Sequence, residues 1–392
     1  MTERIAQVRA LVTGGGGGAD YHDQPGEHWI TGRIATPMAL YPEYRETRTS
    51  FGIDVLGSVV VEVESESGVV GIGVSTGGLP AAFLVERHLA RFVEGERADR
   101  IGLMWDRMWR ASLFYGRKGL AVNAISAVDL ALWDLLGRLR GEPVMSLIGG
   151  AVHDELRCYA TGPRPDLAQA LGFVGGKLPL RHGPAEGEAG LRRNLETAAE
   201  MRGRVSDDFF LAYDCWMSLD LEYALRLAEG LRPYSFRWIE ECLQPDDYWG
   251  YAELRRRAPP GLLVTTGEHE AGLHGFRLLI DMGCCDFVQP DVGWCGGLTE
   301  LLRIAAYADA HGVRVVPHGS SVYSYHFAIT RPATEFVEFL MMSPAADEVV
   351  PMFSPLLLDE PVPEDGRLRV PERPGFGVEL NRELELERPF AR

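Results

Sequence analysis

Two hydrophobic patterns divide the chain into a shorter first part and a longer second part. Residues 55–76 alternate apolar and polar positions on both sides of a Glu-Ser-Gly turn, which is typical of a β-hairpin. Residues 123–140 place Ile, Val and Leu at three- and four-residue intervals, which predicts a helix with a buried face. Strands followed by helices predict an α+β domain over residues 1–140.

From about residue 155, short apolar runs alternate with segments of helical periodicity. Eight strands that alternate with helices predict a barrel of the TIM type over residues 141–369. The last helix of this barrel is expected to be missing or replaced, because the chain after Met342 is Pro-rich and irregular. Residues 370–392 are expected to return to the first domain. The eight runs are 156–162, 172–177, 209–214, 236–241, 262–268, 285–291, 313–319 and 336–341.

Charge and composition exclude several kinds of partner. The formal net charge is −17 and the pI is about 5.1, so the protein repels phosphate backbones and nucleic acid is not expected as a partner. No run of 18 apolar residues and no apolar N-terminal leader occurs, so neither a membrane span nor export is expected. The six cysteines show no regular C-x-x-C pairing, which favours reduced thiols in a cytoplasmic enzyme.

Acidic residues end four consecutive apolar runs, and a histidine ends the next one. Asp214, Glu240, Glu268, Asp291 and His318 follow one another at steps of 26, 28, 23 and 27 residues, each close to one strand–helix unit of a barrel. Active sites of such barrels lie at the carboxyl ends of the strands. We therefore expect these five side chains to converge at one mouth of the barrel.

Three of these carboxylates form a candidate metal site. Asp214, Glu240 and Glu268 would repel one another in a buried position, so they need a cation. Oxygen ligands favour a hard ion, which makes Mg²⁺ the predicted cofactor in preference to zinc. Glu241 is the weaker alternative to Glu240, and one of the three acids could instead serve only as a helix cap.

His318 and Asp291 form a candidate catalytic pair. A carboxylate one strand away can accept a hydrogen bond from one imidazole nitrogen, which fixes the tautomer and raises the basicity of the other nitrogen. This arrangement predicts that His318 acts as a general base with Asp291 as its orienting partner. A histidine alone would more often be structural.

The order of these residues resembles the mandelate-racemase branch of the enolase superfamily. The strings QPDVGWCGG and VVPHGSSVYS, and shorter ones such as YHDQPGEHWI, GFVGGK, TGEH and PGFGVELNR, extend the resemblance over nearly the whole chain. The resemblance implies an α/β fold, namely an enolase-type (β/α)7β barrel, a modified TIM barrel, with an α+β N-terminal capping domain. It implies a Mg²⁺-dependent hydro-lyase that dehydrates an acid sugar, and a homo-oligomer for which an octamer is one candidate.

The resemblance also assigns roles to single residues. Asp214, Glu240 and Glu268 correspond to the metal ligands, and His318 and Asp291 to the base and its partner. Glu338 corresponds to a residue that contacts the substrate and stabilises the transition state. His22 and Arg48 correspond to substrate contacts from the capping domain. Without the resemblance, His22 and Arg48 would be read as ordinary loop residues and Glu338 as a buried structural acid.

One position departs from the wider superfamily. Many relatives carry Lys-x-Lys after the second barrel strand, whereas this chain reads Lys177-Leu178-Pro179. A racemase with two opposed bases is therefore disfavoured. Lys177 and His269 are predicted substrate contacts whose roles stay open, since His269 could equally pack behind its neighbour Glu268. Arg181 has no assigned role.

The predicted reaction removes the proton on carbon 2 through a metal-stabilised enediolate and then expels the 3-hydroxyl. The alternatives are a dehydratase of another acid sugar, a noncatalytic relative, which the complete set of acids and histidine disfavours, and a zinc amidohydrolase, which would need a His-x-His after the first strand. A substrate with an apolar end would need an apolar wall. Trp29, Ile30 and Phe51 are candidates for it, unless they are simply core.

Overall fold

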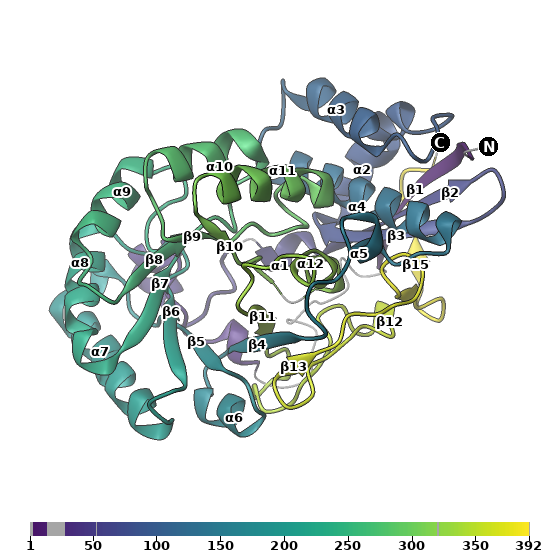
Figure 1. Cartoon of the computed structure of the whole chain (residues 1–392). Coiled ribbons are helices and arrows are strands. Elements are labelled where there is room, and N and C mark those ends of the chain that lie inside the picture. Colours follow the sequence, from purple (N-terminus) through teal and green to yellow (C-terminus); the bar gives the residue numbers. More distant parts are fainter. Residues whose placement is uncertain (1–2, 14–27, 52, 320, 392) are drawn as a thin grey trace.

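The first domain is an antiparallel sheet packed on one long helix. In the computed structural model, strands β1 (Ile5–Thr13), β2 (Ser58–Ser65), β3 (Val70–Thr76) and β15 (Leu386–Glu387) lie in the order β15-β1-β2-β3, and helix α4 (Leu120–Arg140) covers the sheet (Figure 1). The β2–β3 pair is the hairpin that the alternating pattern predicted. The structure describes residues 3–13, 28–51, 53–319 and 321–391.

Two glycines allow α4 to lie directly against the sheet. A Cβ atom at Gly71 would come within 2.2 Å of the Ala131 carbonyl oxygen, and one at Gly73 within 2.1 Å of the Ala127 carbonyl oxygen. Only a residue without a side chain fits such a close backbone approach. Among the described helices, α4 is the one long and apolar enough to cross a membrane, but 89% of its apolar window is buried inside the protein. It is therefore best explained as a core helix.

Shorter helices complete the first domain and lead into the barrel. Trp105 and Trp109 stack on one face of α3 (Ile101–Ser112), and the indole nitrogen of Trp105 donates to the Gly296 carbonyl oxygen of the barrel at 2.6 Å. This contact joins the two domains through a buried hydrogen bond. The helices are α1 (Ile53–Leu56), α2 (Gly78–Leu84), α3 (Ile101–Ser112) and α5 (Val144–Leu147).

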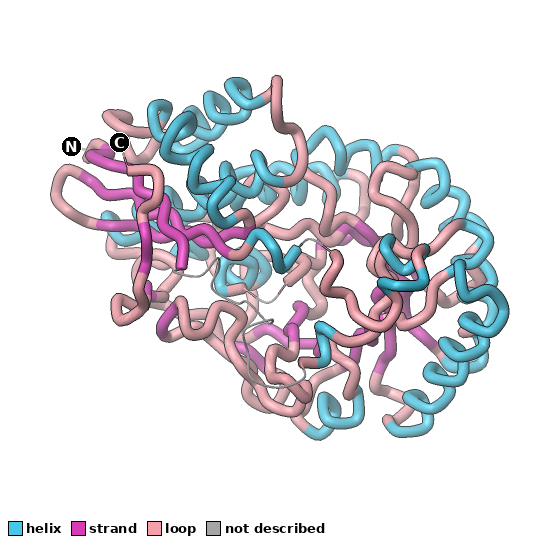
Figure 2. The backbone as a smooth tube through the Cα atoms, turned by 180° about the vertical axis from the view of Figure 1, so that it is seen from behind, coloured by secondary structure: helices cyan, strands magenta, loops and turns pink. Residues whose placement is uncertain are grey.

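The second domain is a curled parallel sheet of eight strands surrounded by helices. Each of the eight predicted apolar runs overlaps one of these strands, and the helices form an outer layer that is plain from behind (Figure 2). The strands are β4 (Leu156–Thr161), β5 (Gly175–Pro179), β6 (Phe210–Asp214), β7 (Phe236–Glu240), β8 (Leu263–Thr266), β9 (Phe287–Val288), β10 (Arg314–Val315) and β11 (Val337–Leu340). The intervening helices are α6 (Pro165–Ala170), α7 (Gly187–Arg204), α8 (Leu221–Gly230), α9 (Tyr248–Arg257), α10 (Gly272–Asp281), α11 (Gly297–Ala310) and α12 (Val322–Ala328).

Among the described residues, seven α-helices between eight strands give the (β/α)7β arrangement, so the predicted fold class is confirmed. The strands lie in the order β10-β9-β8-β7-β6-β5-β4-β11. The two ends of this series meet at the mouth, where the Gly319 amide after β10 donates to the Glu338 carboxylate in β11 at 2.8 Å. Parallel strands carry all their carboxyl ends to the same side, so the residues that follow them share one mouth.

The segment after β11 runs back along both domains. Strand β13 (Arg367–Leu368) pairs antiparallel with the start of β4, and β15 (Leu386–Glu387) pairs with the end of β1. Strands β12 (Leu357–Leu358) and β14 (Glu379–Leu380) pair with each other. The exact boundary between the domains stays a prediction.

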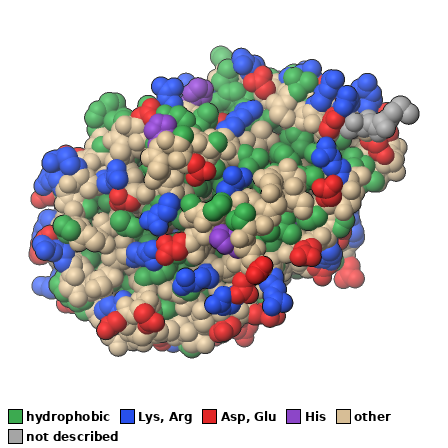
Figure 3. Space-filling view, viewed as in Figure 1, with side chains coloured by type: hydrophobic (Ala, Val, Ile, Leu, Met, Phe, Trp, Pro, Cys, Tyr) green, Lys and Arg blue, Asp and Glu red, His purple; other side chains and the backbone are tan. Residues whose placement is uncertain are grey.

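An aromatic cluster fills the barrel interior below the mouth. The rings of Trp238 and Phe336 stack at 5.9 Å, and Tyr159 packs edge-on against Trp238 at 5.2 Å. The Trp238 indole nitrogen donates to the Glu240 carboxylate at 2.9 Å. Packed side chains thus close one end of the barrel and leave the polar groups at the other. On the outside, acidic and basic side chains are interspersed over the face shown in Figure 3.

Candidate active site

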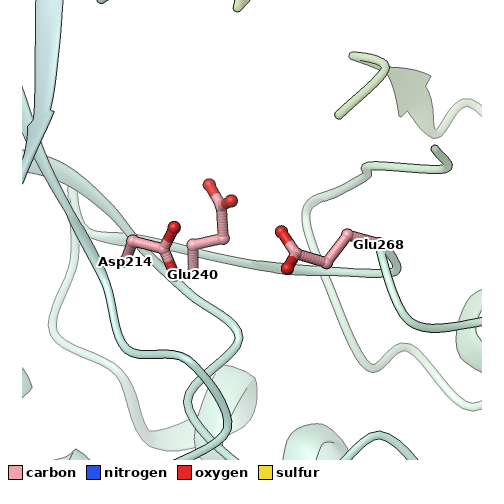
Figure 4. A group of neighbouring side chains, drawn as sticks. All are labelled: Asp214, Glu240 and Glu268. Atoms are coloured by element: carbon pink, nitrogen blue, oxygen red, sulfur yellow. The ribbon is translucent and has the colours of Figure 1, made fainter. Parts of the chain in front are cut away.

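Three carboxylates meet at the mouth of the barrel. Asp214 and Glu240 are the last residues of β6 and β7, and Glu268 lies two residues after β8. Asp214 and Glu240 are direct partners in the parallel ladder, so strand register places their side chains side by side. One oxygen from each of the three residues lies within 4.8 Å of the others, and Figure 4 shows Asp214 and Glu268 extending from opposite sides towards Glu240. All three are buried.

The buried acids carry an electrostatic cost. Burial raises the pKa of Asp214, raises that of Glu240 to about 8 and raises that of Glu268 to about 7, with the neighbouring acids adding to the effect. Glu268 Oε2 accepts no well-formed hydrogen bond among the described residues, although His318 Nε2 lies 3.2 Å away. An all-oxygen set with an unsatisfied buried oxygen fits a hard divalent cation such as Mg²⁺.

Lys177 supplies a positive charge inside this acid cluster. Its Nζ donates to Glu240, lies 2.9 Å from Glu338 Oε1 and lies 3.3 Å from Asp214 Oδ2, and the side chain is fully buried. Burial lowers the pKa of Lys177, but the surrounding Glu240, Glu338 and Asp214 outweigh burial and hold it well above the usual value. Lys177 is therefore a permanent cation in contact with two of the three candidate ligands, a position that the sequence did not reveal.

His318 and Asp291 form a hydrogen-bonded pair beside the acids. Pairing resumes between the two residues after the short strands β9 and β10, and His318 Nδ1 lies 2.9 Å from Asp291 Oδ2. Its other nitrogen, Nε2, faces Glu268. Burial lowers the pKa of His318, but the neighbouring carboxylates of Glu268, Glu338 and Asp291 raise it by more. The pKa of His318 therefore lies well above its usual value. The pair has the geometry of an imidazole oriented by a carboxylate.

Glu338 lies in β11 and is held in its charged form. Its Oε1 accepts from Thr161 Oγ1 at 2.5 Å and from Lys177, and its Oε2 accepts from the Gly319 amide. Burial alone would raise the pKa of Glu338, but Lys177 and His318 lower it to about 2. A fixed buried carboxylate at this point suits an acid that orients a polar substrate. The contributions of Thr161 and Gly319 were not predicted, because neither residue type signals such a contact.

The backbone separates Glu241 from Glu240. Glu241 has a positive φ of 47°, and its Oε1 accepts from the Thr266 hydroxyl at 2.5 Å and the Gly267 amide at 2.9 Å. Its Oε2 faces His269 Nδ1 at 3.3 Å, and the same nitrogen lies 3.2 Å from Glu268 Oε1. The structure thus places Glu240, and not Glu241, in the acid cluster. His269 lies against the edge of that cluster.

Arg48 reaches the barrel mouth from the first domain. It is buried, its Nε donates to the Ile30 carbonyl oxygen at 2.5 Å, and its guanidinium lies 4.6 Å from the centre of the Trp216 ring. The Trp216 amide in turn donates to Asp214 at 3.2 Å. Trp216 thus links Arg48 to the loop that follows Asp214. His22, the other predicted contact from this domain, lies outside the described residues.

Both domains of this chain match models of known protein families. Residues 166–384 match the family described as enolase C-terminal domain-like, and residues 47–149 match the N-terminal domain of the mandelate racemase / muconate lactonizing enzyme family. The first match alone covers more than half of the chain. This chain therefore belongs to the mandelate racemase / muconate lactonizing enzyme family of enolase-like proteins, as its sequence predicted.

Within this family, the chain is more similar to two rhamnonate dehydratases than to a cycloisomerase. An L-rhamnonate dehydratase of Saccharopolyspora erythraea is 64% identical over 387 residues, which cover 99% of this chain and 99% of that protein. The crystal structure of rhamnonate dehydratase from Gibberella zeae complexed with Mg has a TM-score of 0.94 at 47% identity and covers 97% of this chain and 95% of its own. The 3,6-anhydro-D-galactonate cycloisomerase of Zobellia galactanivorans is more distant, with a TM-score of 0.77, 26% identity and 97% coverage of both chains.

Replacing Lys177 by Met is expected to make the folded state depend on the metal. Removing one partner from a buried ion pair destabilises a protein by about 3–5 kcal/mol, because the remaining charge is uncompensated. A divalent cation on the acids can restore much of this charge, so Mg²⁺ should raise the Tm of Lys177→Met more than that of the wild type. Calorimetric scans with and without Mg²⁺ measure both shifts.

Lys118→Met is the matched control. Lys118 Nζ pairs with Asp246 at 2.6 Å and Glu270 at 2.8 Å, away from the three acids. Its removal should lower the Tm without changing the shift that Mg²⁺ produces. Equal Mg²⁺-induced shifts in the wild type and in Lys177→Met would contradict the place of Lys177 in the electrostatics of the site.

Proposed function

We propose that this protein dehydrates the acid sugar L-rhamnonate to 2-keto-3-deoxy-L-rhamnonate and water, with Mg²⁺ as cofactor. The observation that carries the proposal is the buried cluster of Asp214, Glu240 and Glu268 facing the His318–Asp291 pair. The relatives named L-rhamnonate dehydratase, matched over almost the full chain, support this choice of substrate. The homo-oligomeric assembly and the cytoplasmic location remain predictions.

The candidate ligands define what the metal would contribute. Mg²⁺ held by Asp214, Glu240 and Glu268 would supply the positive charge that stabilises the anion left when a carboxylic acid loses its proton at carbon 2. Lys177, already in contact with two of these acids, adds a fixed positive charge beside them. Burial strengthens both effects because little water is present to screen them.

His318 is placed to move the proton. With Asp291 holding Nδ1, the Nε2 atom faces the acid cluster and can take the proton from carbon 2. The resulting imidazolium can then give this proton to the departing 3-hydroxyl, which leaves as water. The enol that remains becomes the 2-keto-3-deoxy acid, so protons and electrons balance. A single acid–base residue is consistent with Pro179 standing where many relatives carry a second lysine.

The remaining polar groups suit substrate binding. Arg48 and Lys177 are cations near the place of the substrate carboxylate, and Glu338 can accept from substrate hydroxyls. His269 lies at the edge of the acid cluster. We propose these four residues and His22 as substrate contacts.

A panel of acid sugars tests the proposal directly. Wild-type protein with Mg²⁺ should form 2-keto-3-deoxy products from several acid sugars, with the highest kcat/KM for L-rhamnonate, and a chelator should stop the reaction. A different preferred acid sugar would keep the mechanism and replace the substrate. Absence of turnover on the whole panel would overturn the proposed function.

A further inference from the structure

A cavity adjoins the acid cluster between the two domains. Its volume is about 310 Å³. Phe51, Leu56 and Leu120 of the first domain form one side of it, and His269 and Trp294 of the barrel form the other. The cavity is thus built from both domains, although the residues placed so far in the reaction lie almost entirely in the barrel.

The barrel side of this cavity is also the edge of the active site. The Trp294 ring centre lies 5.3 Å from that of His318, and the Trp294 indole nitrogen donates to the Thr76 hydroxyl at 3.1 Å. His269 Nδ1 lies 3.2 Å from Glu268 Oε1. A substrate whose carboxylate lies at the acid cluster can therefore extend past these two rings into the cavity.

The side formed by the first domain is apolar and extends to the loop that follows Asp214. Phe51 packs edge-on against Trp216 at 6.1 Å, and the Trp216 amide donates to Asp214. Leu120 is the first residue of α4, after Gly119 with a φ of 65°. Aliphatic and aromatic walls of this kind favour an apolar group of a ligand.

One polar atom in this apolar cavity lacks a partner. Asn123 lies in the first turn of α4 and lines the cavity, and only 9% of it is exposed. Its Oδ1 is buried and accepts no hydrogen bond from any described residue. Buried acceptors are nearly always satisfied, because leaving one unpaired is costly. An unpaired amide oxygen here indicates a ligand that donates a hydrogen bond.

We infer that this cavity binds the end of the acid sugar that is remote from its carboxylate. This inference rests on the proposed function. The carbon-6 methyl group packs against Phe51, Leu56 and Leu120, and the carbon-5 hydroxyl donates to Asn123 Oδ1. Leu120 and Asn123 are then specificity-determining residues in a core helix, and the cavity selects a 6-deoxy sugar acid by combining an apolar wall with a single acceptor.

Substrates that differ by one group test each contact separately. L-Lyxonate is L-rhamnonate without carbon 6, so Leu120→Ala should lower kcat/KM roughly tenfold for L-rhamnonate and leave the value for L-lyxonate unchanged. Leu103→Ala, on an exposed position of α3, is the matched control and should change neither value. Equal losses on both substrates would overturn the apolar wall, because a general structural defect does not depend on carbon 6.

The hydroxyl contact has its own pair of substrates. 5-Deoxy-L-lyxonate differs from L-lyxonate only by the carbon-5 hydroxyl. Asn123→Leu keeps the shape of the side chain and removes the acceptor, so kcat/KM for L-lyxonate should fall about 10- to 100-fold while that for the deoxy compound stays unchanged. Asn123→Ala is the second variant if the Leu substitution prevents folding, and Asn381→Leu is the control outside the cavity.

The outcomes separate the inference from the function on which it rests. Turnover of L-rhamnonate by the wild type, together with equal effects of Asn123→Leu on both lyxonates, would overturn the subsite and keep the proposed function. Absence of turnover by the wild type would overturn both. Substrate-specific losses at both positions would establish the subsite.

Discussion

The His318→Asn variant is expected to lose both dehydration and exchange of the carbon-2 proton with solvent. Asparagine keeps a polar side chain of similar reach but cannot accept a proton at neutral pH. General bases contribute roughly 10²- to 10⁴-fold to rates, and here the same residue also returns the proton, so kcat should fall by about 10³-fold or more. Proton NMR of the substrate in D₂O with Mg²⁺ follows exchange and product formation in one sample.

His311→Asn provides the control for this experiment. His311 is an exposed histidine whose Nδ1 contacts the Tyr307 carbonyl oxygen at 2.8 Å, far from the acids. Its replacement should leave both rates near those of the wild type. Exchange of the carbon-2 proton that persists in His318→Asn would remove His318 from the role of base, even if dehydration were lost.

The barrel could be predicted because its strands are buried on both faces. Such strands are continuous apolar runs, and the acids that follow them stand out against this background. Two predicted strands were nevertheless too long: runs 285–291 and 313–319 contain only β9 and β10, each of two residues. Pro290 and Pro317 interrupt the ladders because proline has no amide hydrogen to donate. Pairing resumes at Asp291 and His318, which keeps the catalytic pair together.

Lys177 shows what apolar runs do not reveal. The predicted run 172–177 placed Lys177 at the end of a strand, whereas β5 extends to Pro179 and Lys177 lies in its middle. Successive residues of a barrel strand point alternately to the interior and to the helices, so the register of β5 decides whether the Lys177 amine lies among the acids or outside the barrel. The sequence offers no signal that fixes the register here.

The cavity between the domains could not be predicted either. Leu120 and Asn123 belong to a helix whose periodicity is that of a core helix, and most of that helix is core. Only the position of its first turn across the cavity from Trp294 and His269 makes these residues cavity walls. Among the three predicted wall residues, Phe51 lines this cavity, whereas Ile30 packs with Met342 in a separate cluster.

Chelation of the metal is expected to abolish dehydration, and added Mg²⁺ is expected to restore it. Without a cation, the anion formed at carbon 2 would develop beside Asp214, Glu240 and Glu268, and Lys177 alone cannot offset four negative charges. A metal ion stabilises such a transition state by several kcal/mol, which corresponds to a loss of about 10³-fold or more in kcat. Oxygen ligands predict that Mg²⁺ restores activity better than Zn²⁺.

Asp214→Asn extends this test to the ligand set. Losing one charged ligand should raise the Mg²⁺ concentration needed for half-maximal activity by about 100-fold or more, since each carboxylate contributes charge as well as an oxygen. Glu270→Gln is the matched control: Glu270 is equally buried, but it accepts from Lys118 and Tyr248 and does not belong to the cluster. It should lower stability and leave the Mg²⁺ requirement unchanged. Activity of the wild type that survives exhaustive chelation would exclude metal-assisted chemistry, whereas a normal Mg²⁺ requirement in Asp214→Asn would remove Asp214 from the ligands.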